Sequence, residues 1–502
     1  MSTAAALLVA AALAGCGTTT YFAGRTLPPS GIANRVLIAI QNPSAFSTGS
    51  LQFVDAYYDI RFKYNSANTG AAYSIAGYSG NLPVTIQNMP EELGGAVYAS
   101  GDGSFTLISY AGEKSSGAVS GLNGKSSSVF TTRNQSYVFA ASQSLHVLTV
   151  VDKSATSAGT YALNLPDVYR VSVNPGGTVA LAFAQNSNYV YYPRKLTAAQ
   201  STAYTGGPAN WPKAAVDCEP FTAPGWCLFQ AQSPDNTDAT GNTYGAPLVF
   251  DRPVKAVFSA DGGTAYVLNC GPECGGTASS VSLLPVGPMI YLLGEQSGLL
   301  PCNSSPCSNT HTIPITKIPV TGGASNALLN SSTMYVVGQQ QSKTDICGGS
   351  NAYCWGGYLT VVNLQTNTVT PSTGTVPNPV SISDGAPGAM SRMVLADDNT
   401  LWIGMTQCNN GERANHGLPN GCLTMFNTSS NTVTLLEPYN NDATGIAAVT
   451  GLHKIYTAEG GQVYIYSTKD GTAIDNQYVT VTGTAYDVAY MDADSDTNNT
   501  VY

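Results

Sequence analysis

Residues 391–408 read SRMVLADDNTLWIGMTQC, and residues 421–438 read GCLTMFNTSSNTVTLLEP. These segments hold four short apolar runs, each bounded by turn-forming residues: Met393–Ala396, Leu401–Met405, Leu423–Phe426 and Val433–Leu436. Short runs separated by Asn, Asp, Gly and Ser are typical of antiparallel strands joined by turns. They predict one small four-stranded sheet, which cannot bury both of its faces by itself.

Units of the same kind recur between residues 34 and 491. Repeated small sheets bury their faces by stacking around an axis, so the pattern predicts an all-β fold, a β-propeller of four-stranded antiparallel blades. Eight blades are favoured, with seven as the alternative. Tyr486–Met491 has the pattern of an innermost strand, and the first unit lacks one. We therefore expect this C-terminal strand to close the ring by pairing with Val36–Ile40, which removes an exposed sheet edge.

The expected domain organisation is simple. Residues 1–15 form a lipoprotein signal peptide, residues 16–33 a tether, and residues 34–502 a single propeller domain. The fourth unit carries a long insertion at about 194–245, after which Pro247–Phe250 is expected to be its outer strand.

The N-terminus resembles a bacterial lipoprotein signal. The apolar run Ala4–Ala14 is too short to span a bilayer, and it ends in Leu-Ala-Gly-Cys at residues 13–16. This resemblance implies lipidation of Cys16 and attachment at the outer membrane or cell surface, with a periplasm-facing position as an alternative. No Lys or Arg precedes the apolar run, which departs from the pattern. A plain cleaved signal peptide is the other interpretation, and it also implies export.

Composition excludes one class of partner. The net charge is −10 and only 10% of residues are charged. Binding to nucleic acid requires clusters of Lys and Arg, which this chain does not offer. We expect a monomer without a nucleic-acid partner.

The cysteines indicate disulfides. The chain has 11 Cys, and those other than Cys16 fall in neighbouring couples: Cys218/Cys227, Cys270/Cys274, Cys302/Cys307, Cys347/Cys354 and Cys408/Cys422. Export makes local pairing within each couple chemically available. The second, fourth and fifth couples are expected in loops between the second and third strands of blades five, six and seven, on one face of the ring. The other two are expected on the opposite face.

The repeats resemble the YVTN-type and lactonase-like propeller repeats of bacterial surface and periplasmic proteins. The resemblance rests on the second strands Met334–Val337 and Ala265–Leu268 and on the third strands Leu359–Asn363 and Leu148–Asp152. It covers most of residues 34–491. It implies the fold but not one function, because this fold hosts lactonases, dehydrogenases, adhesins and assembly scaffolds.

The loops that are expected to be closed by disulfides supply candidate binding residues. Tyr353 and Trp355 flank Cys354 and are candidates for an aromatic contact with sugar or peptide. Glu412, Arg413 and His416 are a candidate polar site in the next blade. Packing around the disulfide, and a solvated loop tip, are the respective alternatives. We expect the partner to be a protein or polysaccharide of the envelope.

An acidic segment near the C-terminus is a candidate calcium site. Asp492, Asp494, Asp496 and Asn498 alternate along the chain, as ligands do in calcium loops. The Gly and closing Glu of an EF-hand are missing, so an ordinary Asp-rich turn is the alternative.

No catalytic residue is assigned, because the chain carries no recognised enzyme motif. The expected inner strands hold mostly Ala, Val, Ser and Thr, with Arg170, Lys255 and Arg392 as exceptions. We therefore favour an exported, lipid-anchored binding or scaffolding protein over an enzyme. The alternative is an exported propeller enzyme, lactonase-like or a quinoprotein-like oxidoreductase.

Overall fold

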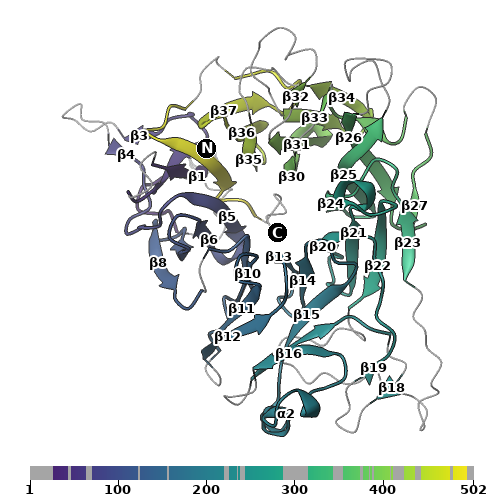
Figure 1. Ribbon diagram of the computed structural model, residues 1–502. Helices are drawn as coiled ribbons and strands as arrows, with labels where there is room; N and C mark the ends of the chain where they lie inside the picture. The colour runs from purple at the N-terminus through teal and green to yellow at the C-terminus, as the bar shows by residue number, and fades with distance from the viewer. Residues whose placement is uncertain are drawn as a thin grey trace, which may run out of the picture.

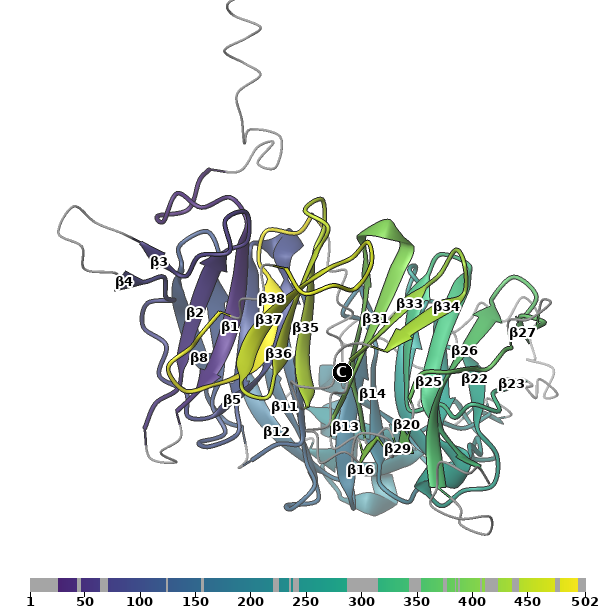
Figure 2. The ribbon, with the colours of Figure 1, turned by 90° about the horizontal axis from the view of Figure 1, so that it is seen from above.

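The computed structural model describes most of the propeller domain, namely residues 26–42, 47–63, 71–122, 125–154, 158–219, 225–233, 236–237, 243–286, 315–342, 354–372, 377–383, 385–386, 389–406, 409–410, 423–435, 442–474 and 479–494. Its strands are arranged in a ring (Figure 1), and they run between the two faces of a disc that Figure 2 shows edge-on. The fold prediction is confirmed: the protein is an all-β propeller of eight antiparallel blades.

Blade one is made from both ends of the chain. Its innermost strand is β38 (Thr484–Tyr490), followed outward by β1 (Arg35–Gln41) and β2 (Ser50–Asp55). In the β1–β38 pair, Val36 lies opposite Tyr490 and Ile38 opposite Val488. The predicted closure of the ring by the C-terminal strand is therefore confirmed.

The strands of blades two and three follow the chain from the centre outward. Blade two contains β5 (Pro83–Met89), β6 (Gly94–Ala99), β7 (Phe105–Ser109) and β8 (Lys114–Val119). Blade three contains β9 (Ser128–Thr131), β10 (Tyr137–Ser142), β11 (Val147–Asp152) and β12 (Gly159–Asn164).

Blades five to eight follow the same order. Blade five contains β20 (Pro253–Phe258), β21 (Thr264–Asn269), β22 (Ser280–Pro285) and β23 (Thr316–Pro319). Blade six contains β24 (Asn326–Asn330), β25 (Thr333–Ser342), β26 (Cys354–Asn363) and β27 (Thr368–Val369), with β28 (Val380–Ser381) also paired to β26. Blade seven contains β30 (Ala389–Ala396), β31 (Thr400–Thr406), β33 (Leu423–Asn427) and β34 (Thr432–Leu435). Blade eight contains β35 (Ala443–Val449), β36 (Lys454–Glu459) and β37 (Gln462–Ser467), and Val479 bridges to Val463 at its outer side.

Blade four differs from the expectation. After β13 (Val168–Val173), β14 (Ala180–Ala184) and β15 (Val190–Lys195), the fourth strand is β17 (Trp226–Gln230), and β16 (Ala215–Glu219) adds a fifth. The outer strand predicted at Pro247–Phe250 is wrong: this segment forms only an isolated bridge from Pro247 to Gln232. Trp226, Leu228 and Phe229 are buried between blades, so an apolar segment within the expected insertion takes the strand position.

Small elements complete the described chain. They are the hairpins β3 (Phe62–Lys63)–β4 (Ala71–Ala72) and β18 (Asn236–Thr237)–β19 (Thr243–Tyr244), the pair β29 (Gly385–Ala386)–β32 (Asn409–Asn410), the helix α2 (Ala198–Tyr204), and the 3-10 turns η1 (Pro90–Glu92), η2 (Pro208–Asn210), η3 (Gly271–Cys274) and η5 (Asp397–Asn399). Helix α2 lies at the rim beside β16 (Figure 1). Within the described residues, no helix has the length and apolar character that crossing a membrane requires.

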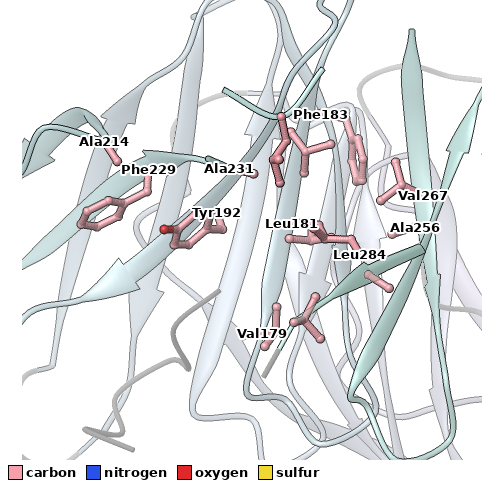
Figure 3. Packing of buried hydrophobic residues seen from close by; sticks show 14 of the residues in the cluster. Val179, Leu181, Phe183, Tyr192, Ala214, Phe229, Ala231, Ala256, Val267 and Leu284 are labelled. Atoms are coloured by element: carbon pink, nitrogen blue, oxygen red, sulfur yellow. The ribbon is translucent and has the colours of Figure 1, made fainter. Parts of the chain in front are cut away.

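The core lies between blades. Figure 3 shows Leu181 and Phe183 of β14 beside Ala256 and Val267 of blade five, and all four are buried in one apolar cluster. Complete burial of a Leu or Phe side chain contributes roughly 1.5–3 kcal/mol. Because each blade buries both faces against its neighbours, stability depends on an unbroken ring.

The inner strands have one edge without a strand partner, and side chains of the preceding blade bind part of that edge. Asp487 Oδ2 of blade one accepts from the backbone N–H of Ile86 in blade two at 2.7 Å. The backbone N–H of Ala256 in blade five donates in the same way to Ser172 Oγ in blade four, at 3.2 Å. Buried backbone groups are costly when unpaired, so these contacts stabilise the centre of the ring.

A buried ion pair fixes the closing strand. The guanidinium of Arg35 donates to both carboxylate oxygens of Asp492, from Nε at 3.0 Å and from Nη2 at 2.7 Å. Arg35 Nη1 also binds Glu113 Oε1 of blade two at 2.9 Å. These contacts join the start of β1, the residue after Met491 and the second blade.

We predict that Asp492→Ala destabilises the protein by about 3–5 kcal/mol, because it removes one carboxylate of a buried ion-pair cluster and takes the acceptor from Arg35 Nε and Nη2, while Glu113 stays bound to Nη1. Asp494→Ala is the matched control: Asp494 is exposed two residues later, and its loss should change stability by about 0.5 kcal/mol or less. Denaturant unfolding of the two variants measures the difference. Equal stabilities would show that the Arg35–Asp492 pair does not hold the ring closed.

Candidate functional site

The inner strands share an irregularity at the same position. In six of them the pairing with the second strand skips one residue, and the residue that follows the skip is Thr85, Arg170, Lys255, Arg392, Gly445 or Asp487. β-Bulges of this kind change the direction in which a side chain points and are frequent beside functional sites. Three of the six positions carry a cation and one carries a carboxylate.

Arg392 and Asp487 form an ion pair that spans one blade of the ring. Arg392 Nη2 of blade seven contacts Asp487 Oδ2 of blade one, so the pair passes the inner strand of blade eight. Gly445 occupies the equivalent position there, and a Cβ on it would lie 2.6 Å from Asp487 Oδ1. The glycine is required because any side chain would collide with the carboxylate of Asp487.

Lys255 reaches the next blade. Its Nζ donates to Asn326 Oδ1 of β24 at 2.8 Å, and the side chain is almost completely buried. We call Arg170, Lys255, Asn326, Arg392 and Asp487 the charged belt. It brings side chains from blades four, five, six, seven and one into a single cluster.

Electrostatics within the charged belt favour neutral Lys255. Burial, together with the positive charges of Arg170 and Arg392, lowers the pKa of Lys255 to about 7. Burial raises the pKa of Asp487, while Arg392 and the backbone N–H groups of Ile86 and Val488 oppose that rise. Both arginines therefore disfavour the protonated form of Lys255, although the whole chain carries a net charge of −10.

A cavity of about 610 Å³ opens at the ends of the inner strands. Its lining includes one residue from each of six blades: Asn88, Phe130, Val173, Phe258, Leu328 and Leu395. Because these strands come from around the ring, we call it the central cavity. Val257 and Leu328 also line it, and Lys255 and Asn326 each lie two residues earlier on the same strands, about 7 Å deeper.

The rim of the central cavity is polar. Arg133, Ser331, Ser332 and Gln365 lie there, while its walls are mostly apolar side chains. Binding sites for small molecules combine apolar walls with a few placed polar groups, which describes the central cavity and the belt below it.

The structure describes part of the disulfide-bearing loops between the second and third strands of blades five to seven, which were predicted to hold binding residues. Cys270 and Cys274 form the predicted local disulfide, with a Cα–Cα distance of 5.6 Å, in the turn between the second and third strands of blade five. Glu273 in this turn accepts from Gln339 N at 3.0 Å and from Gln339 Nε2 at 3.1 Å, which fixes the turn to blade six. Trp355 is half-buried on β26 opposite Gln341. Tyr353, Glu412, Arg413 and His416 lie outside the described residues.

The Cys218–Cys227 disulfide is also confirmed. It joins opposite residues of β16 and β17, so it staples two outer strands of blade four rather than an irregular insertion. Cys16, Cys302, Cys307, Cys347, Cys408 and Cys422 lie outside the described residues, as does the side chain of Cys354.

The candidate calcium residues are only partly described. Asp492 is buried, and both of its carboxylate oxygens accept from Arg35, while Asp494 is exposed. Asp496 and Asn498 lie outside the described residues. Among the described residues, no three His, Cys, Asp or Glu side chains gather as a metal site would require.

Sequence reasoning singled out Arg170, Lys255 and Arg392 as exceptions but did not bring them together, and it did not include Asp487. One feature of the sequence could have grouped these four residues: each lies three or four positions before the end of an inner strand, and therefore at a similar height in the ring. Register alone could not show that Arg392 and Asp487 meet across a blade.

Comparison with solved structures supports the fold alone. No family model matches the chain, and no curated protein matches it in sequence. Similar structures include the dihydro-heme d1 dehydrogenase NirN in complex with DHE, with a TM-score of 0.50 and 10% identity over 93% of this chain and 79% of that one. Kuenenia stuttgartiensis hydrazine synthase has a TM-score of 0.46 and 12% identity, over 77% and 95% of the two chains. A 6-phosphogluconolactonase candidate from Bacteroides uniformis has a TM-score of 0.40 and 11% identity, over 91% and 99%.

We predict a specific pH dependence of stability from Lys255. Between pH 7 and about 10, the unfolded chain keeps the lysine proton that the folded protein releases, so stability rises with pH. Relative to Lys255→Met, the wild type should gain up to about 1.4 kcal/mol per pH unit in this range. Lys213→Met, at an exposed lysine, is the control.

Chemical unfolding of the three proteins at pH 7, 8 and 9 provides the measurement. The wild type and Lys213→Met should show the same slope, and Lys255→Met a smaller one. Parallel curves for all three would mean that Lys255 has an ordinary pKa in the folded protein.

Proposed function

We propose that this protein is an exported binding protein of the cell envelope, anchored by lipid at Cys16, which takes up a ligand through the central cavity. The observation that carries the proposal is the 610 Å³ cavity, formed jointly by the inner strands of six blades. A site built from many blades is rigid, because each strand is held on both faces by its neighbours. Such preorganisation reduces the entropic cost of binding.

Two observations support export. The disulfides Cys218–Cys227 and Cys270–Cys274 are of the kind that forms in oxidising compartments. The N-terminal sequence ends its apolar run in Leu-Ala-Gly-Cys at residues 13–16. We infer that the ligand of the central cavity is a molecule of the envelope. A protein or polysaccharide of the envelope would bind the disulfide-bearing loops of blades five to seven.

An exported propeller enzyme is the second candidate. The observation that favours it is the pKa of Lys255 near 7, since a buried lysine that is partly neutral can act as a general base or nucleophile. The two functions are separable: an enzyme converts the bound compound, and a binding protein releases it unchanged.

Closing the cavity rim should abolish uptake. Gln365 is exposed and lines the central cavity, so Gln365→Trp should obstruct its mouth without disturbing the core. Thr366→Trp is the matched control, because Thr366 is the exposed neighbour in the same turn and does not line the cavity. We expect small molecules fractionated from envelope extract to raise the Tm of the wild type and of Thr366→Trp, but not of Gln365→Trp. Mass spectrometry of the recovered compound then distinguishes binding from conversion.

If no fraction raises the Tm of the wild type, or if Gln365→Trp responds equally, the central cavity is not the binding site. The disulfide-bearing turn of blade five that contains Glu273, with the neighbouring loops of blades six and seven, would then be the better candidate.

Lipid attachment has an independent test. Cys16→Ser removes the thiol that would carry the lipid, so the variant should leave the membrane fraction or accumulate with its signal peptide uncleaved. Fractionation followed by intact-mass measurement reports both outcomes. An unchanged distribution and mass would exclude lipid at Cys16.

A further inference from the structure

Exposed apolar side chains gather at one end of blade one. Among the described residues, seven large apolar side chains are exposed, and four of them belong to the first 35 described positions. These four are Leu27, Tyr57, Tyr58 and Ile60, with exposures of 61%, 60%, 68% and 39%. The other three occur singly, on blade three, on β16 and before blade five. Single exposed apolar side chains are normal on a protein surface, whereas a group of them marks an interaction site.

Three of the four share the turn that follows β2. We call Tyr57, Tyr58 and Ile60 the apolar turn. The rings of Tyr57 and Tyr58 are in edge-to-face contact, with 4.8 Å between their centroids. Backbone hydrogen bonds close the turn, from Asp55 N to Ile60 O at 2.9 Å and from Ile60 N to Asp55 O at 3.3 Å. The turn therefore presents its apolar side chains to solvent as one group.

Blade eight fixes the apolar turn in place. Lys454 Nζ donates to Ala56 O at 3.0 Å and pairs with Asp59 Oδ2 at 2.6 Å, and the hydroxyl of Tyr456 contacts Asp59 Oδ1. The ion pair with Lys454 offsets the charge of Asp59, which lies between Tyr58 and Ile60. A turn that is already fixed loses little conformational entropy when it binds a partner.

The chain that leads into β1 lies at the same face of the disc as the apolar turn (Figure 2). Ala56 N donates to Asn34 O at 2.8 Å, and Ser30 N donates to Glu113 Oε2 of blade two at 2.9 Å. Leu27 lies 11 residues after Cys16. A lipid on Cys16 would therefore hold Leu27 within about 40 Å of the bilayer, even if the intervening chain were fully extended.

The central cavity opens on this face as well. Because the strands of a blade alternate in direction, turns between first and second strands share one face with turns between third and fourth strands. Pro175 and Ala260, in turns of the first kind, line the cavity. β1 begins and β2 ends at that face, so contact of the apolar turn with a membrane would keep the cavity mouth on the side of the bilayer.

We propose that the apolar turn, together with Leu27, is the surface through which this protein lies on a phospholipid membrane. The inference rests on the proposed function, in which lipid at Cys16 supplies the other attachment. Tyrosine suits the boundary between headgroups and acyl chains, because its ring is apolar and its hydroxyl stays in contact with water. Stable attachment to a membrane commonly combines one lipid chain with a second contact, and the fixed turn also sets the orientation of the ring.

Tryptophan fluorescence in the full chain tests the contact. Tyr58→Trp keeps an aromatic side chain at the exposed position, and Leu145→Trp is the matched control. Leu145 is 50% exposed in the turn between the second and third strands of blade three, on the opposite face. In phosphatidylcholine vesicles, the emission that Tyr58→Trp adds to the wild-type signal should shift to shorter wavelength. In vesicles whose acyl chains carry bromine, a quencher, that emission should lose intensity, while the emission added by Leu145→Trp should do neither.

Footprinting of the wild type gives a second measurement without any substitution. Hydroxyl radicals oxidise exposed Tyr and Leu side chains, and mass spectrometry locates the oxidation. Phosphatidylcholine vesicles should reduce oxidation of Tyr57 and Tyr58 relative to Leu145. Unfolding curves of both Trp variants establish that they are folded.

The outcomes separate this inference from the proposed function. If the two Trp variants respond equally, or neither responds, the apolar turn is not the membrane contact, even where intact mass shows lipid on Cys16. A shift of the Tyr58→Trp emission without quenching by bromine would place the turn against protein, and it would overturn the inference too. If only Tyr58→Trp is quenched and Cys16 carries no lipid, the membrane contact stands and the proposed lipid attachment is wrong.

Discussion

The pairing of β38 with β1 is the contact on which the other contacts of the ring depend. Each blade is stable only between two neighbours, because both faces of its sheet are apolar. Without β38, the first blade has no inner strand, and Ile86 loses the carboxylate that binds its backbone N–H. The Arg35–Asp492 ion pair holds this contact, and Glu113 extends it to blade two.

The closing strand also contributes to the candidate site. Asp487 on β38 holds Arg392 across blade eight, and Gly445 leaves the space that the pair needs. Closure of the fold and assembly of the charged belt therefore use the same strand. One consequence is that the belt exists only in the closed ring, since its members come from residues more than 300 positions apart in the chain.

Rigidity and charge have opposite energetic effects at the centre of this protein. Interlocked blades, bulges at equivalent positions and side-chain contacts to strand edges fix the side chains. In return, buried cations are held close together, which lowers the pKa of Lys255. Functional sites commonly store unfavourable electrostatics that the surrounding fold offsets.

The sequence by itself determined the elements and their stacking. Short apolar runs between turn residues are local signals, and they were sufficient for eight blades and for closure by residues 486–491. The close spacing of cysteines in the chain was sufficient for the local disulfides Cys218–Cys227 and Cys270–Cys274. The pattern of apolar and turn residues gave the wrong fourth strand in blade four. Pro247–Phe250 was expected there, but Trp226–Gln230 pairs with β15 because its side chains are buried between blades. Only the tertiary structure brought Arg170, Lys255, Arg392 and Asp487 together and paired Asp492 with Arg35. Charge pairing across a ring depends on distances in space, and no spacing along the chain encodes them.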